Sequence, residues 1–195
     1  MDNLSPIAWA LRPLKRYAEF SGRSSRAEFW WFFLFMMILY AVMYFFFIGS
    51  LMSAAMTQAD TEAPSVGVLG AVGIFGIFMI LVWLALLVPS IAVGVRRLHD
   101  TNRSGWWLGG YFLLYAVYLA MLFGSIGSMM TSAAAGTGDP SQAAGGMFGL
   151  TMVLGLLMFV YAITLIVFYC LPGTTGPNRY GDDPYGTKDL DQVFG

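Results

Sequence analysis

Side chains that could do chemistry gather in three short segments of the sequence, at residues 20–32, 96–107 and 171–184. Arginine occurs in all three, and its planar guanidinium group binds carboxylates and phosphates through two parallel hydrogen bonds. Acidic side chains accompany the arginines. The candidate binding residues are Arg23, Arg26, Glu28, Arg96, Arg97, His99, Asp100, Trp106, Trp107, Asn178, Arg179 and Tyr180. These residue types suit recognition of an anionic group as well as pairing with one another.

His99 and Asp100 have the residue types of a general base and its carboxylate partner. However, no Ser or Cys has a recognisable nucleophile motif around it, and His99 is the only histidine, so a second histidine ligand for a metal is lacking. Hydrogen bonding within its loop is the favoured role of His99. We expect a protein that is not an enzyme and needs no cofactor or metal. An enzyme centred on His99 and Asp100 is the weakest alternative.

The composition places these polar segments between long apolar runs. Of the 195 residues, 58% are hydrophobic and 11% are charged, against about 45–50% and about 25% in soluble domains. Four uncharged stretches, of about 24 to 30 residues each, exceed the roughly 20 residues that cross a bilayer as a helix. They run over residues 29–52, 66–95, 106–130 and 147–171. We therefore predict an all-α membrane bundle of four transmembrane helices.

The basic residues predict how the chain is oriented. All ten Lys and Arg residues lie before residue 29, between residues 96 and 105, or after residue 171. With four spans these segments share one side, which the positive-inside rule makes cytoplasmic. The remaining connectors, about 53–65 and 131–146, hold Asp60, Glu62 and Asp139 without a basic residue, and we expect them to be short, mobile loops. Both termini should be cytoplasmic: an amino-terminal segment (1–28) and a tail (172–195) flank the membrane domain (29–171).

Two local features concern the membrane interface. Trp30, Trp31, Trp106 and Trp107 begin the first and third spans, where indole rings favour headgroup depth. The amino-terminal stretch predicts a short interfacial helix, with Ser5 as its cap and Pro6 in its first position. Pro13 should keep that helix short or bend it.

The spans themselves contain no Asp, Glu, Lys, Arg or His. Proton-coupled transporters and pumps generally need ionisable groups at that depth, so this absence argues against a proton or metal-ion pathway. Glycines recur every three residues from Gly67 to Gly76 and let helices approach closely. Packing within the bundle is their favoured role, and a homo-oligomer seam is the alternative. Pro89 and Gly94 mark places where the second span could bend.

The three polar segments also resemble a known family, the domain of unknown function 805 family of bacterial inner-membrane proteins. Its members carry G-R-x-x-R-x-E-F-W before the first span, matched here at residues 22–30. They carry R-R-L-H-D and S-G-W-W before the third span, matched at 96–107, and L-P-G-x-x-G-x-N-R-Y-G-x-D-P after the last, matched at 171–184. The resemblance extends over most of the chain. It implies four spans in the bacterial inner membrane, and it implies no settled biochemical activity.

The predicted topology brings the three segments to the same membrane face. Our hypothesis is an ion-paired platform there, with the Gly/Pro-rich tail folded back on residues 96–100. Three roles stay open for it: local pairing that supports topology and stability, binding of anionic lipid headgroups or a phosphate ligand, and docking of a cytoplasmic or membrane protein. A small oligomeric transporter or permease is the alternative from another class. With a net charge of −1, the sequence does not indicate a nucleic-acid partner.

Overall fold

The computed structural model describes residues 4–58, 66–135 and 140–184. The described residues form five helices: α1 (Pro6–Lys15), α2 (Arg26–Gln58), α3 (Val66–Asp100), α4 (Trp106–Ala135) and α5 (Pro140–Cys170). Apart from one isolated bridge between Asn178 and Gly181, these residues contain no β-structure. The predicted all-α class is confirmed.

Four of the helices are long and apolar enough to cross a membrane, as the sequence predicts. The candidate spans are Arg26–Met56, Gly73–Asp100, Trp106–Ala134 and Phe148–Cys170. Each has at least 23 residues, which exceeds the length of about 20 that the hydrocarbon core requires. Their hydrocarbon-facing side chains are largely exposed in the isolated chain, as they would be against lipid tails.

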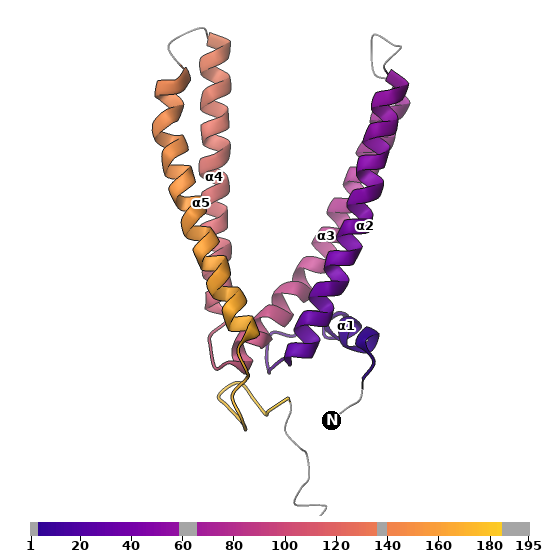
Figure 1. Ribbon diagram of the computed structural model, residues 1–195, viewed down its shortest axis with the longest axis vertical. Helices are drawn as coiled ribbons and strands as arrows, with labels where there is room; N and C mark the ends of the chain where they lie inside the picture. The colour runs from indigo at the N-terminus through magenta and orange to yellow at the C-terminus, as the bar shows by residue number, and fades with distance from the viewer. Residues whose placement is uncertain (1–3, 59–65, 136–139, 185–195) are drawn as a thin grey trace, which may run out of the picture.

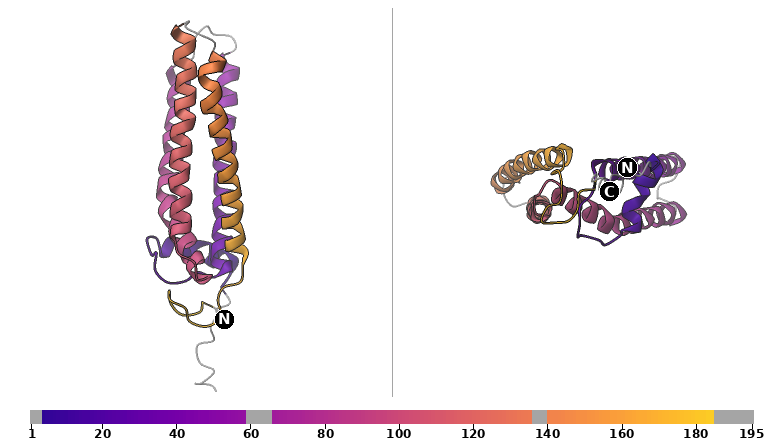
Figure 2. Two further views of the ribbon diagram at one scale, coloured as in Figure 1. Left: turned by 90° about the vertical axis from the view of Figure 1, so that its left-hand side faces the viewer. Right: turned by 90° about the horizontal axis from the view of Figure 1, so that it is seen from below.

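The spans are arranged as two helical hairpins. Figure 1 shows α2 beside α3 and α4 beside α5, with the two pairs joined at one end and diverging toward the other. That shared end also holds α1, the α3–α4 connection and residues 171–184, and we call it the charged end. Helix α1 lies across α2 and α3 there (Figure 2). Because α3 contacts both α2 and the second hairpin, it links the two pairs.

The two clusters of buried apolar side chains found in the described residues lie near the charged end. Phe32, Met36 and Val93 join α2 to α3. A second cluster of Leu98, Leu165 and Tyr169 joins α3 to α5. The chain is therefore packed most tightly where the two hairpins meet.

The amino-terminal helix forms as predicted. The Ser5 hydroxyl accepts a hydrogen bond from the Ala8 amide at 3.2 Å, and Pro6 occupies the first helical position. Pro13 lies inside α1 two residues before its last residue, Lys15, and the helix has only ten residues. This cap satisfies an amide that would otherwise lack a partner within the helix.

The helix boundaries differ from the expected ones at three connectors. Helix α3 continues through Asp100, so residues 96–100 are helical although the sequence suggested a connector. The expected outer loops are also partly helical, because α2 extends to Gln58 and α4 and α5 cover 131–135 and 140–146. The reason is local: Ala, Met, Arg and Leu in these stretches favour helix, and the one proline among these helical residues, Pro140, stands in the first position of α5. Asp60, Glu62 and Asp139 lie outside the described residues.

Asn102, two residues after the end of α3, adopts a left-handed conformation. Asn102 has φ = 57°, and its amide donates to the His99 carbonyl at 3.0 Å. The next amide, of Arg103, reaches back to the Leu98 carbonyl at 2.9 Å. Two such bonds around a left-handed residue form a Schellman motif, which fixes the direction of the chain after the helix.

This cap generates a prediction about Asn102. Asn102→Gly should leave the melting temperature of the purified protein nearly unchanged, because glycine adopts positive φ freely. Asn102→Val should lower stability by roughly 1–2 kcal/mol, the usual cost of a left-handed conformation for a residue with a Cβ. Thermal unfolding in detergent measures both, and equal melting temperatures for the two variants would contradict the assignment.

Candidate functional site: a buried ion cluster at the charged end

The three polar segments meet at the charged end, as predicted. The Ser24 amide donates to the Arg96 carbonyl at 3.1 Å, which joins the segment before α2 to α3. The Thr174 amide donates to the Asp100 carbonyl at 2.9 Å, which joins the tail to the same helix. The end of α3 therefore lies between the other two segments.

Asp100 is the centre of this arrangement. Its Oδ1 accepts a hydrogen bond from Arg23 Nε at 2.9 Å, and Arg23 Nη2 lies 2.8 Å from the same oxygen. Its Oδ2 is bound by Arg97 Nη1, from one turn earlier in α3. All three side chains are buried. A buried carboxylate requires such compensation, because the charge is otherwise costly to remove from water.

A second buried pair joins α2 to α3. Arg96 Nη2 donates to Glu28 Oε1 at 3.0 Å, and both side chains are buried. Glu28 belongs to the first turn of α2, where a negative charge also suits the helix dipole. The preceding cap is Ser25, whose hydroxyl accepts from the Glu28 amide at 3.1 Å.

The rim of this second pair comes from α1 and the segment after it. Arg12 and Arg16 lie 3.8 and 3.9 Å from Glu28 Oε2. Arg16 also forms a two-bond pair with Glu19, with both distances 2.7 Å. These hydrogen bonds lower the pKa of the Glu19 carboxyl below its ordinary value. The carbonyls of residues 16 and 19 accept from Arg96 Nη1.

The arginines of the cluster also hold the tail. Arg23 Nη1 donates to the Gly176 carbonyl at 2.6 Å, and its Nη2 donates to the Thr174 carbonyl. Arg97 Nε donates to the Tyr169 carbonyl at 3.1 Å, and its Nη2 binds the Leu171 carbonyl. The last carbonyls of a helix lack partners within it, so Arg97 caps α5. The predicted folding back of the tail is thus present.

The tail itself is shaped by Asn178 and Asp183. The Asn178 side-chain amide donates to the His99 carbonyl at 3.0 Å and to the Thr174 hydroxyl at 2.9 Å. Asp183 Oδ2 accepts from the Gly176 amide at 3.0 Å. These bonds hold residues 173–183 as a loop on the end of α3.

His99 has a different set of partners from Asp100. Its Nδ1 lies 3.2 Å from the Gly22 carbonyl, and its ring stacks on Tyr180 with centroids 3.8 Å apart. Arg179 extends from the same stack to the Asn102 carbonyl at 3.0 Å. Because both Asp100 oxygens are bound by guanidinium groups, His99 and Asp100 do not form the pair that a general base needs.

The predicted residues Trp106 and Trp107 lie outside the cluster, as does the neighbouring Arg103. Trp106 is 84% exposed, and Trp107 packs against Tyr161 and Phe168 of α5. Arg103 lies over the Phe168 ring, 4.0 Å from its centroid. These side chains border the second hairpin and do not contact Asp100.

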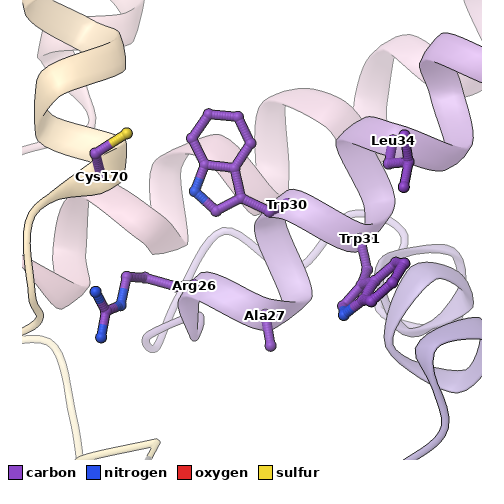
Figure 3. A pocket seen from close by; sticks show the side chains of 6 residues that line it. All are labelled: Arg26, Ala27, Trp30, Trp31, Leu34 and Cys170. Carbon is purple, nitrogen blue, oxygen red and sulfur yellow. The ribbon is translucent and has the colours of Figure 1, made fainter.

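Arg26 lies in a pocket beside the cluster. The pocket has a volume of about 520 Å³ and is lined by Arg26, Ala27, Trp30, Trp31, Leu34 and Cys170. Figure 3 shows Arg26 and Trp30 on the side of α2 that faces Cys170, and Trp31 on the other side. Arg26 is exposed, so this arginine, unlike Arg23, Arg96 and Arg97, is accessible to an external anion.

Several contributors were not among the candidate residues. Thr174 and Gly176 bind Arg23 through main-chain carbonyls, which carry no signature in the sequence. Ser25 could have been found, since Ser-x-x-Glu before an apolar run is the pattern of a capped helix start. Within the described part of the chain, no group of three His, Cys, Asp or Glu side chains could hold a metal ion.

Comparison with known proteins agrees with this architecture. The family described as protein of unknown function (DUF805) matches residues 17–182. The chain belongs to this family. Inner membrane protein YhaI of Escherichia coli strain K12 is 28% identical over 178 residues, which cover 91% of this chain and 96% of YhaI. Inner membrane protein YhaH of the same strain is 31% identical over 176 residues, covering 90% and 95%. No solved structure matches the chain.

The matched region of the DUF805 family begins before the first polar segment and ends within the third. It therefore includes every side chain of the buried cluster and all four candidate spans. The relatives are inner membrane proteins, consistent with the four membrane-capable helices described here.

The tight fit of the tail generates a prediction about Gly173. A Cβ built at this position would overlap the Asp100 carboxylate, lying 2.6 Å from its Cγ. Gly173→Ala should therefore displace the tail and destabilise the protein by about 1–3 kcal/mol, the usual cost of overpacking. Limited proteolysis of the tail and thermal unfolding measure the effect.

Gly127→Ala is the matched control, because a Cβ there meets nothing within 4 Å. It should resemble the unmodified protein in both measurements. Wild-type resistance to proteolysis in Gly173→Ala would contradict the docking of the tail on Asp100.

Proposed function

We propose that this protein is a non-enzymatic component of the bacterial inner membrane whose charged end lies in the cytoplasm and engages the headgroups of anionic lipids. The observation that carries the proposal is the exposed Arg26 in a pocket with Trp30 and Trp31. Arginine suits phosphate recognition, and tryptophan suits headgroup depth.

The buried cluster supports headgroup binding at Arg26 because its own arginines are not accessible to a ligand. Arg23, Arg96 and Arg97 are already bound to Asp100, Glu28 and main-chain carbonyls, and their side chains are shielded from solvent. An anionic ligand would have to break these bonds to reach them. Binding therefore falls to basic residues on the outer surface of the charged end.

Helix α1 provides further contact with an anionic surface. Ile7 and Leu11 are exposed apolar side chains on it, while Arg12 and Lys15 belong to its last turn. A short helix with exposed apolar and basic residues suits the plane of the membrane interface. Trp106, exposed at the start of α4, adds an interfacial ring at the same end.

The alternatives receive less support. An enzyme would need a reactive pair, and His99 and Asp100 bind other groups. A permease for polar solutes would need a polar pathway, whereas the described pocket between the hairpins is lined mainly by Phe, Met, Leu, Ile and Val. The experiment below distinguishes docking of a protein partner at the charged end from lipid binding.

Removing the Arg26 charge should weaken the preference for anionic lipid. In nanodiscs of phosphatidylcholine and phosphatidylglycerol, Arg26→Gln should lower the enrichment of phosphatidylglycerol on the protein about fivefold, since one basic residue near the surface contributes about 1 kcal/mol. Native mass spectrometry of retained lipids measures this enrichment.

Arg26→Lys is the matched variant, which keeps the charge and should restore most of the enrichment. Arg179→Gln removes a charge whose guanidinium group donates to the Asn102 carbonyl in the α3–α4 connection, and it should have a smaller effect. If Arg26→Gln retains the full preference for phosphatidylglycerol but loses a co-purifying protein, the charged end is a protein-docking site and the lipid proposal is wrong.

The orientation has a separate test. In a Cys170→Ser background, Thr131→Cys lies at the far end of α4 and Thr175→Cys lies in the exposed part of the tail. A membrane-impermeant maleimide added to intact spheroplasts should label the first and not the second. Labelling of Thr175→Cys before permeabilisation would reverse the orientation and remove the proposed cytoplasmic face.

A further inference from the structure

A second pocket lies between the two hairpins, on the membrane side of the charged end. It has a volume of about 450 Å³ and receives side chains from all four long helices, among them Phe33, Met37, Ser90, Gly94, Phe112 and Tyr169. We call it the crevice. Its size falls within the range of ordinary ligand pockets, about 300–1,000 Å³.

The crevice is closed on the side that faces the buried ion cluster. Phe29 packs against Tyr169 with centroids 4.4 Å apart and against Trp30 edge to face at 5.2 Å. At Gly94 a Cβ would lie 3.1 Å from Leu108 and 3.3 Å from the Tyr169 hydroxyl, so α3, α4 and α5 are already in close contact there. An occupant must therefore enter from the membrane.

The chemistry of the crevice suits a hydrocarbon chain. None of the described side chains that line it is charged. The Ser90 hydroxyl donates to the Leu86 carbonyl at 2.6 Å, so its one donor is used within α3. Beyond the crevice the hairpins diverge (Figure 1), and water in such an apolar space would lack partners.

The crevice adjoins the Arg26 pocket along one stripe of α2. Arg26, Trp30, Phe33 and Met37 follow the spacing i, i+4, i+7 and i+11, which places them on one face of a helix. Trp30 lines the Arg26 pocket, Phe33 and Met37 line the crevice, and the rings of Trp30 and Phe33 meet edge to face at 5.6 Å. The stripe thus leads from an exposed arginine to an apolar space.

We infer that one acyl chain of an anionic phospholipid occupies the crevice between the hairpins while its phosphate lies at Arg26. This inference rests on the proposed function, because the headgroup contact is the same. It adds that the lipid is held as a discrete ligand, with its chain between α2 and the second hairpin. The charge at one end of the stripe and the apolar lining at the other match the two parts of a phospholipid.

Filling the crevice tests the inference. Met37 lines it and is 55% exposed, whereas the next residue, Ile38, is 56% exposed and does not line it. Met37→Trp should place an indole in the crevice and reduce retained lipid at least threefold, for phosphatidylcholine and phosphatidylglycerol alike. Ile38→Trp, the matched control, should retain lipid as the unmodified protein does. Native mass spectrometry of the full chain released from nanodiscs measures both.

Ser90→Leu fills the crevice from α3, and it tests the inference if Met37→Trp does not reach the membrane. If both variants fold and still retain as much lipid as the unmodified protein, the inference is wrong. It is also wrong if either variant converts a dimer into a monomer, because a second copy of the chain would then be the occupant. If Arg26→Gln leaves the lipid preference unchanged while Met37→Trp displaces lipid, the headgroup proposal fails and the acyl-chain site stands.

Discussion

The structure depends on one buried carboxylate, Asp100, at the end of α3. Its charge is stable away from water only because Arg97 and Arg23 bind its two oxygens. Each of these arginines has further donors that also need acceptors, and the carbonyls of α5 and the tail supply them. Satisfying a single carboxylate therefore determines where three separate segments of the chain lie.

This constraint explains why the hairpins can diverge. Lipid tails are as apolar as the side chains of the spans, so the hydrophobic effect does not drive α2 and α3 onto α4 and α5 within the bilayer. The links between the pairs are instead concentrated at the charged end, where ion pairs, hydrogen bonds and the cluster around Leu98 coincide. A bundle held at one end lets its two hairpins diverge toward the other (Figure 1).

The sequence predicts much of this arrangement because its strongest signals are long and uninterrupted. Four uncharged runs predict the spans, and Ser5 and Pro6 predict the start of α1. Because the basic segments are predicted to lie on the same side of the membrane, they are also predicted to meet at one end of the bundle. It does not assign Arg96 to Glu28 and Arg97 to Asp100, because neighbouring residues on a helix point about 100° apart and only the packed structure shows which carboxylate each side chain meets. The sequence does not predict the carbonyl partners of Arg23 either, because every residue type carries the same main-chain oxygen.

Each guanidinium group of an arginine-rich motif is easily interpreted as a ligand contact. In this protein, burial divides the arginines into two classes, although all of them carry the same guanidinium group. Arg23, Arg96 and Arg97 neutralise internal carboxylates, and exposing any of them to a ligand would leave a charge uncompensated inside the protein. Arg26, by contrast, is exposed and lies one helical turn before Trp30 on the stripe of α2 that leads to the crevice. The closed cluster thus fixes the position of α2, and that position is what places Arg26 at the entrance to an apolar site.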